Sequence, residues 1–350
     1  MSEACFTAAD ILLPAAGVPL DPWACIAVDQ FTSQPEYWQR AEHLADGKPS
    51  TLHIVLPEAY LGTPQEAERL ESIRRMMEEY RKSVLTRKVH GYVYVERTQM
   101  DGTVRQGLVG AVDLDAYDYA KGSKPAIRPS ESTVVERIPP RMKIRKNAVL
   151  EMPHILILID DPGRTVIEPA AEALLSGSGI QPVYDTELMK NGGHLKGYLI
   201  DQSTGGELYA HIFKSMEELA RSSGGFLFAV GDGNHSLASA KCHYEDLKRA
   251  GLPCRNARYA MVEIVNLHDQ GILFEPIHRV LFGAEHEKLT AFLQSRGCRL
   301  ERGDTRFHIL SYITESGEGR IAIPRELHRL AVGALQLLLD AYVRENAECK

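Results

Sequence analysis

Residues 226–247 change character abruptly, from an apolar run to a polar glycine turn and then to an amphipathic helical pattern. The apolar run Phe226–Val230 is typical of a buried strand, and the helical pattern begins directly after the turn at residues 231–236. Because glycines flank Asp232, the backbone can bend sharply there and approach a ligand closely. The segment therefore predicts a strand, a tight turn and a helix N-terminus, which is a building unit of α/β folds.

The turn also concentrates groups that can bind and react. Unpaired N–H groups at a helix start favour anions, and the side chains add a carboxylate, an amide, an imidazole and a hydroxyl. Asn and Ser are also common helix N-caps, so a purely structural turn is the alternative. We favour a phosphate or carboxylate site formed by Gly231, Asp232, Gly233, Asn234, His235 and Ser236.

Residues 117–145 form the second informative region. They are too polar and too rich in proline for regular core structure, so we predict a long loop. In a chain that is acidic overall they gather seven cations: Lys121, Lys124, Arg128, Arg137, Arg141, Lys143 and Arg145. Ser130, Ser132 and Thr133 add neutral donors, and the cations would hold Glu131 ionised if they lie close to it. A solvated surface loop is the alternative, but long loops without structure are uncommon unless they are functional or disordered.

The composition is that of an ordinary globular protein. The 350 residues are 44% hydrophobic and 25% charged, with a formal charge of −7 that argues against nucleic acid as a ligand. The six cysteines have no CxxC pair, which favours reduced thiols over disulfides or a zinc site. With no signal-peptide pattern and no membrane-spanning run, we expect a cytoplasmic protein that does not bind membranes.

Strand and helix patterns alternate along the whole length. Strands are predicted near 89–96 and 106–114 as a hairpin, and at 155–159 and 261–265. Helices are predicted at 63–84, with Thr63 and Glu66 as a capping box, at 166–175, around 215–221 and at 327–342. The sequence therefore predicts a mixed α/β (α+β) fold as a single large intertwined domain, 1–350, whose internal boundaries are left open.

Three smaller groups of residues each allow a functional and a structural interpretation. His278 and Arg279 either contact a phosphate or pack structurally, and residues 184–194 favour an ordinary hairpin over a flank of the site. Asp29 and Glu36 are acid/base candidates that could equally be solvated turn carboxylates. The chain has no GxxxxGK[ST], GxGxxG, HExxH or GxSxG motif, which removes the main support for P-loop, dehydrogenase, zincin and serine-hydrolase functions.

Several motifs together resemble a large bacterial family known only as a domain of unknown function. They are Lys121-Gly-Ser-Lys124, Ile127-Arg-Pro-Ser-Glu-Ser-Thr-Val134, Glu136-Arg-Ile-Pro-Pro-Arg141, Gly231-Asp-Gly-Asn-His-Ser236 and Pro276-Ile-His-Arg-Val280. The turn alone also resembles the DGHHR-type turn of the ParB/sulfiredoxin-like superfamily, which includes free serine kinases. Asp232 and His235 match its Asp and second His, whereas Asn234 stands at the first His and Ser236 replaces the Arg.

The second resemblance implies a ParB/sulfiredoxin-like phosphate loop and phosphotransfer on serine or O-phosphoserine, with Mg²⁺ and ATP or ADP as possible cofactors. A non-catalytic nucleotide- or phosphometabolite-binding regulatory protein is the alternative, and the oligomeric state is left open. The expected catalytic residues are Asp232, His235 and Glu131. The expected binding residues are Lys124, Arg128, Ser130, Thr133, Arg141, Gly231, Gly233, Asn234, Ser236, His278 and Arg279. We expect residues 128–133 and 231–236 to meet, so that the loop supplies the charge that the turn lacks.

Overall fold

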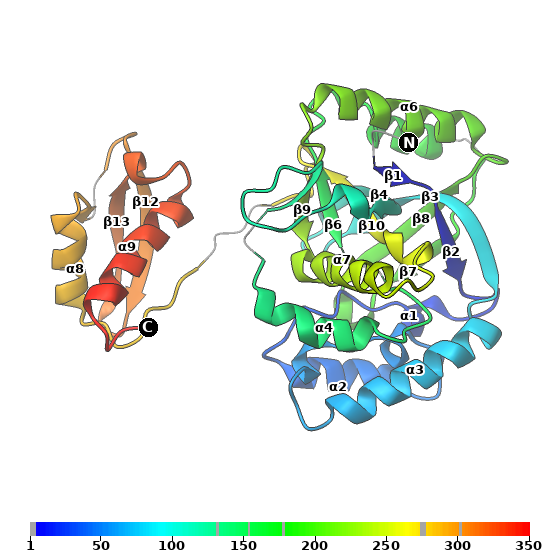
Figure 1. Ribbon diagram of the computed structural model, residues 1–350, viewed down its shortest axis with the longest axis horizontal. Coiled ribbons are helices and arrows are strands. Elements are labelled where there is room, and N and C mark those ends of the chain that lie inside the picture. Colours follow the sequence, from blue (N-terminus) through cyan, green and yellow to red (C-terminus); the bar gives the residue numbers. More distant parts are fainter. Residues whose placement is uncertain (1–4, 131–132, 153–154, 177–178, 274–277, 301–302) are drawn as a thin grey trace. The chain divides into compact units, whose positions relative to one another are not determined.

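The computed structural model describes residues 5–130, 133–152, 155–176, 179–273, 278–300 and 303–350. The described residues belong to two compact units, Met1–Ile272 and Leu273–Lys350 (Figure 1). The sequence predicted no boundary at this position. The first unit contains the interleaved strands and helices and the turn at 231–236, and the second contains the strands and helices that follow residue 273.

Within the described residues, ten strands of the first unit form one mixed sheet. Eight of them follow the order β5-β9-β6-β10-β4-β3-β8-β7, while β1 pairs with β4 and β2 pairs with β3. The strands are β1 (Phe6–Thr7), β2 (Ala9–Leu13), β3 (Arg87–Thr98), β4 (Val104–Asp113), β5 (Ile127–Pro129), β6 (Leu156–Ile159), β7 (Tyr184–Glu187), β8 (His194–Ile200), β9 (Phe228–Asp232) and β10 (Tyr259–Asn266). Most neighbours are antiparallel, but β5 runs parallel to β9 and β6 runs parallel to β10.

The helices of this unit are distributed along the same stretch of chain. They are α1 (Leu20–Trp23), α2 (Pro35–Leu44), α3 (Glu66–Ser83), α4 (Ile138–Arg145), α5 (Glu168–Leu175), α6 (Gly206–Ser222) and α7 (Asn234–Arg249). Short 3-10 turns are η1 (Thr51–His53), η2 (Glu58–Tyr60), η3 (Leu114–Ala116), η4 (Val135–Arg137), η5 (Met189–Asn191) and η6 (Asn256–Arg258).

The two faces of the sheet are covered differently, as the alternation of side chains along a strand requires. On one face, Tyr94, Leu108 and Ile264 belong to a core that also contains Ile212 of α6 and Leu237 of α7. On the other face, the alternate residues Val93, Val95 and Ala111 pack with Ala9, Ile11 and Leu13. Helices therefore cover one face of the central strands, and α7 is among them.

A separate core lies among the N-terminal helices. Trp38 of α2 and Met77 of α3 are buried in it, and Ile144 of α4 packs against it. Helix α4 also packs along α7, and Figure 1 shows α4 between α7 and the pair α2 and α3. This helix thus connects the N-terminal helical layer to the helix that follows the glycine turn.

The second unit is a small sheet with two helices. Its strands β11 (Arg299–Leu300), β12 (Phe307–Thr314) and β13 (Gly317–Pro324) are antiparallel in the order β11-β13-β12. Helices α8 (His286–Ser295) and α9 (Ala331–Glu345) pack through Leu293 and Leu338 onto Ile321 and Ile323, and the turn η7 (Arg325–Leu327) precedes α9.

The predicted mixed α/β class is confirmed, and two local predictions are wrong. Glu66 does not close a capping box with Thr63: its carboxylate accepts a hydrogen bond from the Gly62 N–H (2.6 Å), and the Thr63 hydroxyl donates to the Tyr60 carbonyl. Residues 117–145 are not a continuous loop, since they contain β5 and α4. Pro129 is tolerated because β5 is an edge strand, and two prolines fit the first turn of α4, where their missing N–H groups have no helical acceptor.

Candidate functional site

The turn between β9 and α7 is built as the sequence predicts. Phe228 and Val230 are fully buried, and Gly233 follows the strand with φ +80° and ψ +23° as the residue that caps α7. A side chain at Gly233 would be strained by this backbone and would lie about 3.0 Å from Ile155. The Asp232 carboxylate accepts a hydrogen bond from the Gly233 N–H (2.8 Å), which holds it beside the helix start.

Strand β5 brings the second predicted segment to this turn. It pairs with β9 in parallel, with Ile127 opposite Phe228 and Pro129 opposite Val230. Because parallel strands end at the same edge of a sheet, Ser130 after β5 and Asn234 after β9 lie together. For the described residues of the two segments, the expected contact is therefore confirmed.

Two hydrogen bonds join the segments directly. The Asn234 amide Nδ2 donates to the Ser130 hydroxyl at 3.4 Å, and the Val134 backbone N–H donates to Nε2 of His235 at 3.2 Å. Because Nε2 accepts this hydrogen bond, the proton of the neutral imidazole is on Nδ1. Nothing in the sequence marks Val134 as a site residue, because its contribution comes from the backbone.

Asn234 is the most buried polar residue of the turn. Only 5% of its surface is exposed, and its Oδ1 atom has no hydrogen-bond partner in the described part of the chain. The hydroxyl Oγ1 of Thr133 is also buried, beside the Tyr117 hydroxyl. A buried polar atom left unpaired costs on the order of 1–3 kcal/mol, so Asn234 Oδ1 is an acceptor available to a donor group of a ligand.

The predicted arginines do not reach the turn. The Arg128 guanidinium donates to the Pro125 carbonyl (2.8 Å) and lies 4.3 Å from the centre of the Phe226 ring, at the beginning of β9 rather than at its end. Arg141 forms an ion pair with Glu58 of η2. Lys124 is exposed to solvent. Glu131, the third predicted catalytic residue, lies outside the described residues.

Most of the sequence matches one protein family. A family model described as "Protein of unknown function (DUF1015)" matches residues 12–337. The chain belongs to this family. No curated protein matches the sequence, and no solved structure matches it. The family match extends from β2 to α9 and includes both segments of the candidate site.

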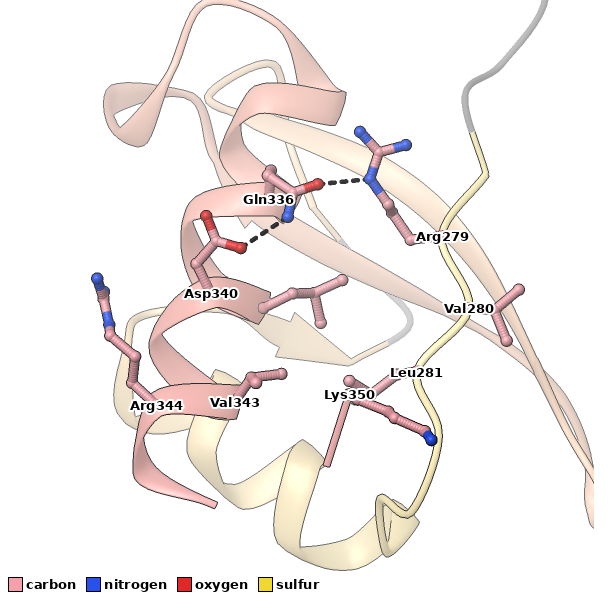
Figure 2. A pocket seen from close by; sticks show the side chains of 9 residues that line it. Arg279, Val280, Leu281, Gln336, Asp340, Val343, Arg344 and Lys350 are labelled. Atoms are coloured by element: carbon pink, nitrogen blue, oxygen red, sulfur yellow. Dashed lines mark hydrogen bonds between the residues drawn. The ribbon is translucent and has the colours of Figure 1, made fainter. Parts of the chain in front are cut away.

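His278 and Arg279 belong to the second unit. There Arg279 donates through Nε to the Gln336 side chain and through Nη1 to the His278 carbonyl, and Gln336 donates to Asp340 (2.7 Å). Figure 2 shows the contacts of Gln336 with Arg279 and Asp340, at the wall of an open cavity between residues 279–281 and α9. The volume of this cavity is about 500 Å³. Three cations (Arg279, Arg344 and Lys350) line the cavity together with Asp340 and apolar side chains.

The remaining acid/base candidates differ in their surroundings. Glu36 is exposed in the first turn of α2. Asp29 lies in the segment before α2 and has a buried carboxylate oxygen, Oδ1, without a hydrogen-bond partner among the described residues. Its neighbour Val28 accepts a hydrogen bond from the Glu58 N–H (2.8 Å), so Asp29 is near the residue that pairs with Arg141.

Helix α7 carries two further titratable groups beyond the turn. The Cys242 thiol lies 3.0 Å from the Tyr119 hydroxyl, and this hydrogen bond together with burial raises the pKa of Tyr119 to about 12. Burial, reinforced by the nearby Arg145 cation, lowers the pKa of His243. Both contacts connect α7 to the segment 117–145 without involving the turn.

The described residues contain no group of three or more His, Cys, Asp or Glu side chains arranged to hold a metal ion. In the same part of the chain, no helix is both long and apolar enough to span a bilayer.

Proposed function

We propose that this protein is a small-molecule phosphotransfer enzyme that acts on serine or O-phosphoserine at the turn between β9 and α7. The observation that carries the proposal is the parallel pairing of β5 with β9, which joins Ser130 and Val134 to Asn234 and His235 at the start of a helix. The turn thus combines an acid/base pair, Asp232 and His235, with N–H groups that favour an anion.

The mixture of donors and acceptors favours an amino-acid phosphate over a simple anion. The N-terminal amides of α7 would hold a phosphoryl or carboxylate group, with Ser236 as an additional donor. The buried Oδ1 atom of Asn234 is an acceptor and suits an ammonium or hydroxyl donor. Serine and O-phosphoserine carry both kinds of group on a small molecule.

In the kinase direction, the serine Oγ attacks the terminal phosphorus of a nucleoside triphosphate. A new O–P bond forms, the bond to the diphosphate leaving group breaks, and a carboxylate takes the hydroxyl proton. We assign that base to Asp232, with the predicted Glu131 as the other candidate. In the opposite direction, His235 would protonate the departing serine oxygen as O-phosphoserine passes its phosphoryl group to water or a nucleotide.

The donor chemistry of the turn fits Mg²⁺ and ATP or ADP. Mg²⁺ keeps most of its waters and needs only one or two protein oxygens together with phosphate oxygens, and Asp232 and Asn234 offer such oxygens. When bound, Mg²⁺ would supply positive charge that offsets the charge of the phosphates. The α7 amides would position the transferring group.

A non-catalytic nucleotide- or phosphometabolite-binding regulatory protein is the second candidate, and two observations favour it. Arg128 and Arg141, predicted to stabilise a transferring phosphoryl group, are engaged away from the turn. Val134 and Val135 expose 44% and 61% of their surfaces beside His235, which gives an apolar surface of the kind on which a base can pack. Either function suits a cytoplasmic protein with a small-molecule partner, and we propose no nucleic-acid or membrane partner.

A direct assay separates these functions. The purified protein is incubated with serine plus ATP or ADP and Mg²⁺, and separately with O-phosphoserine, and products are followed by mass spectrometry and ³¹P NMR. Turnover that is lost in Asp232→Asn and His235→Gln while ligand still binds supports the enzyme. Binding without turnover in either direction supports the regulatory protein, and neither binding nor turnover by folded protein overturns both.

A further inference from the structure

The proposed site lacks an identified cation, although a phosphate at the turn would carry up to two negative charges. Of the seven cations predicted in the segment 117–145, Arg128, Arg141 and Arg145 are engaged elsewhere, the last with Glu151 at 2.5 Å. We propose that Arg137 binds the phosphoryl group of the ligand at this turn. The inference rests on the proposed function and adds a residue that recognises the phosphate.

The position of Arg137 follows from the bond between Val134 and His235. Val134 caps the short 3-10 turn η4, and Arg137 ends that turn and caps α4. The Arg137 N–H donates to the Val134 carbonyl (3.0 Å), so the two residues are one turn apart. Side chains of helical residues tilt toward the helix N-terminus, which directs Arg137 toward the end where Val134 contacts His235.

The guanidinium of Arg137 is available for a ligand. The residue is exposed, and in the described part of the chain only its backbone is bonded, its carbonyl accepting from Arg141. Its neighbour Glu136 is also exposed, but successive residues of a 3-10 turn project about 120° apart, so that carboxylate points to a different side. Arg137 therefore offers a guanidinium that can bind phosphate through two parallel hydrogen bonds.

The other uncommitted cations are less well placed. Lys121 and Lys124 precede β5, at the end of the strand opposite to the turn. Lys143 lies in the last turn of α4, farther along the chain from Val134, which contacts His235. Lys143 is exposed like Arg137, and it therefore provides a control with the same change of charge in α4, the helix that Arg137 caps.

Isothermal titration calorimetry of O-phosphoserine, inorganic phosphate and serine tests the assignment on wild-type protein, Arg137→Gln, Arg137→Lys and Lys143→Gln. Losing a charge-assisted contact should weaken binding of both phosphate-containing ligands by about 10- to 100-fold in Arg137→Gln. Serine binding should change little, Lys143→Gln should resemble wild type, and Arg137→Lys should recover part of the loss. Thermal melts check that every variant is folded.

Three results would distinguish a wrong assignment of Arg137 from a wrong proposed function. Equal phosphate binding by wild type and Arg137→Gln overturns the assignment and leaves the proposed function intact. An equal loss in Arg137→Gln and Lys143→Gln also overturns it, because the effect would then be one of overall charge. Wild-type protein that binds none of the three ligands overturns the proposed function itself.

Discussion

The backbone N–H of Val134 donates a hydrogen bond to Nε2 of His235 across 101 residues of sequence. This bond holds the imidazole against the segment that follows β5 and fixes the neutral tautomer with its proton on Nδ1. A histidine held in one orientation at a helix N-terminus is suited to proton transfer, because orientation and tautomer are set before a ligand arrives.

Replacing His235 should remove turnover while ligand binding persists. We expect His235→Gln to reduce the single-turnover rate by about 10²- to 10⁴-fold, since general acid/base catalysis contributes that much. His243→Gln is the matched control, because His243 lies on the same helix and faces Arg145 rather than the turn. Rapid-quench assays on both variants test this, and equal rates in His235→Gln and wild type would exclude a proton-transfer role.

A single methyl group added at Gly233 should lower the stability of the fold. Gly233 and Gly251 both have positive φ, but a side chain would meet Ile155 at about 3.0 Å only at Gly233, whereas Gly251 faces open space. We expect Gly251→Ala to lower the free energy of unfolding by about 1–2 kcal/mol through backbone strain alone. Gly233→Ala should cost a further ~1–3 kcal/mol from overpacking.

Urea unfolding of both glycine variants measures this difference. The comparison isolates the steric contact, because the backbone conformation is left-handed at both positions. Equal losses in the two variants would show that Ile155 moves aside freely and that β6 and the turn are not tightly packed.

The parts of the site that the sequence could predict are those with local signals. The strand β9, the turn and α7 follow from a buried apolar run, two glycines and a helical pattern within one short segment. The hairpin of β3 and β4, and that of β7 and β8, likewise have their turn residues between alternating strands. These elements need no distant partner to be recognised.

The rest depends on contacts between residues far apart in sequence. Strand β5 has three residues, one of them a proline, and it is a strand only because β9 lies beside it. Nothing near Arg141 indicates its pairing with Glu58, 83 residues earlier. Nothing near Arg128 requires it to pack on Phe226 at the far end of β9. Charge density in a segment therefore predicted a cationic region but not which cations face the turn.

The ion pair of Arg141 and Glu58 should stabilise the fold rather than bind ligand. Its side chains are 15% and 24% exposed, so water screens it weakly. A double-mutant cycle with Glu58→Gln and Arg141→Gln should give a coupling free energy of about 1–3 kcal/mol in urea unfolding. The exposed pair Arg249 and Asp246 is the control and should give less than ~0.5 kcal/mol. A coupling no larger than the control would leave Arg141 available to a ligand.

The contact of Asp113 with Arg258 should make stability depend on acid pH. Burial raises the pKa of Asp113, but hydrogen bonds from Arg258 and the Asp115 N–H outweigh it, so its pKa in the folded protein is lowered. A carboxyl group with a lowered folded-state pKa stabilises the fold above its unfolded pKa of about 3.9 and loses that contribution as pH falls through the folded value. Asp113→Asn should therefore be less stable than wild type at pH 7.

Below about pH 4 the difference between Asp113→Asn and wild type should shrink, because the carboxyl group becomes protonated first in the unfolded chain and, at lower pH, in the folded protein. Urea unfolding of both proteins at pH 7, 5, 4 and 3 measures the difference in the free energy of unfolding at each step. A difference that stays constant from pH 7 to pH 3 would mean that Asp113 acts through its shape and neutral hydrogen bonds, since a charge effect must vanish with the charge. Because Asp113 ends β4 and Arg258 precedes β10, the same series reports how firmly these two central strands are held together.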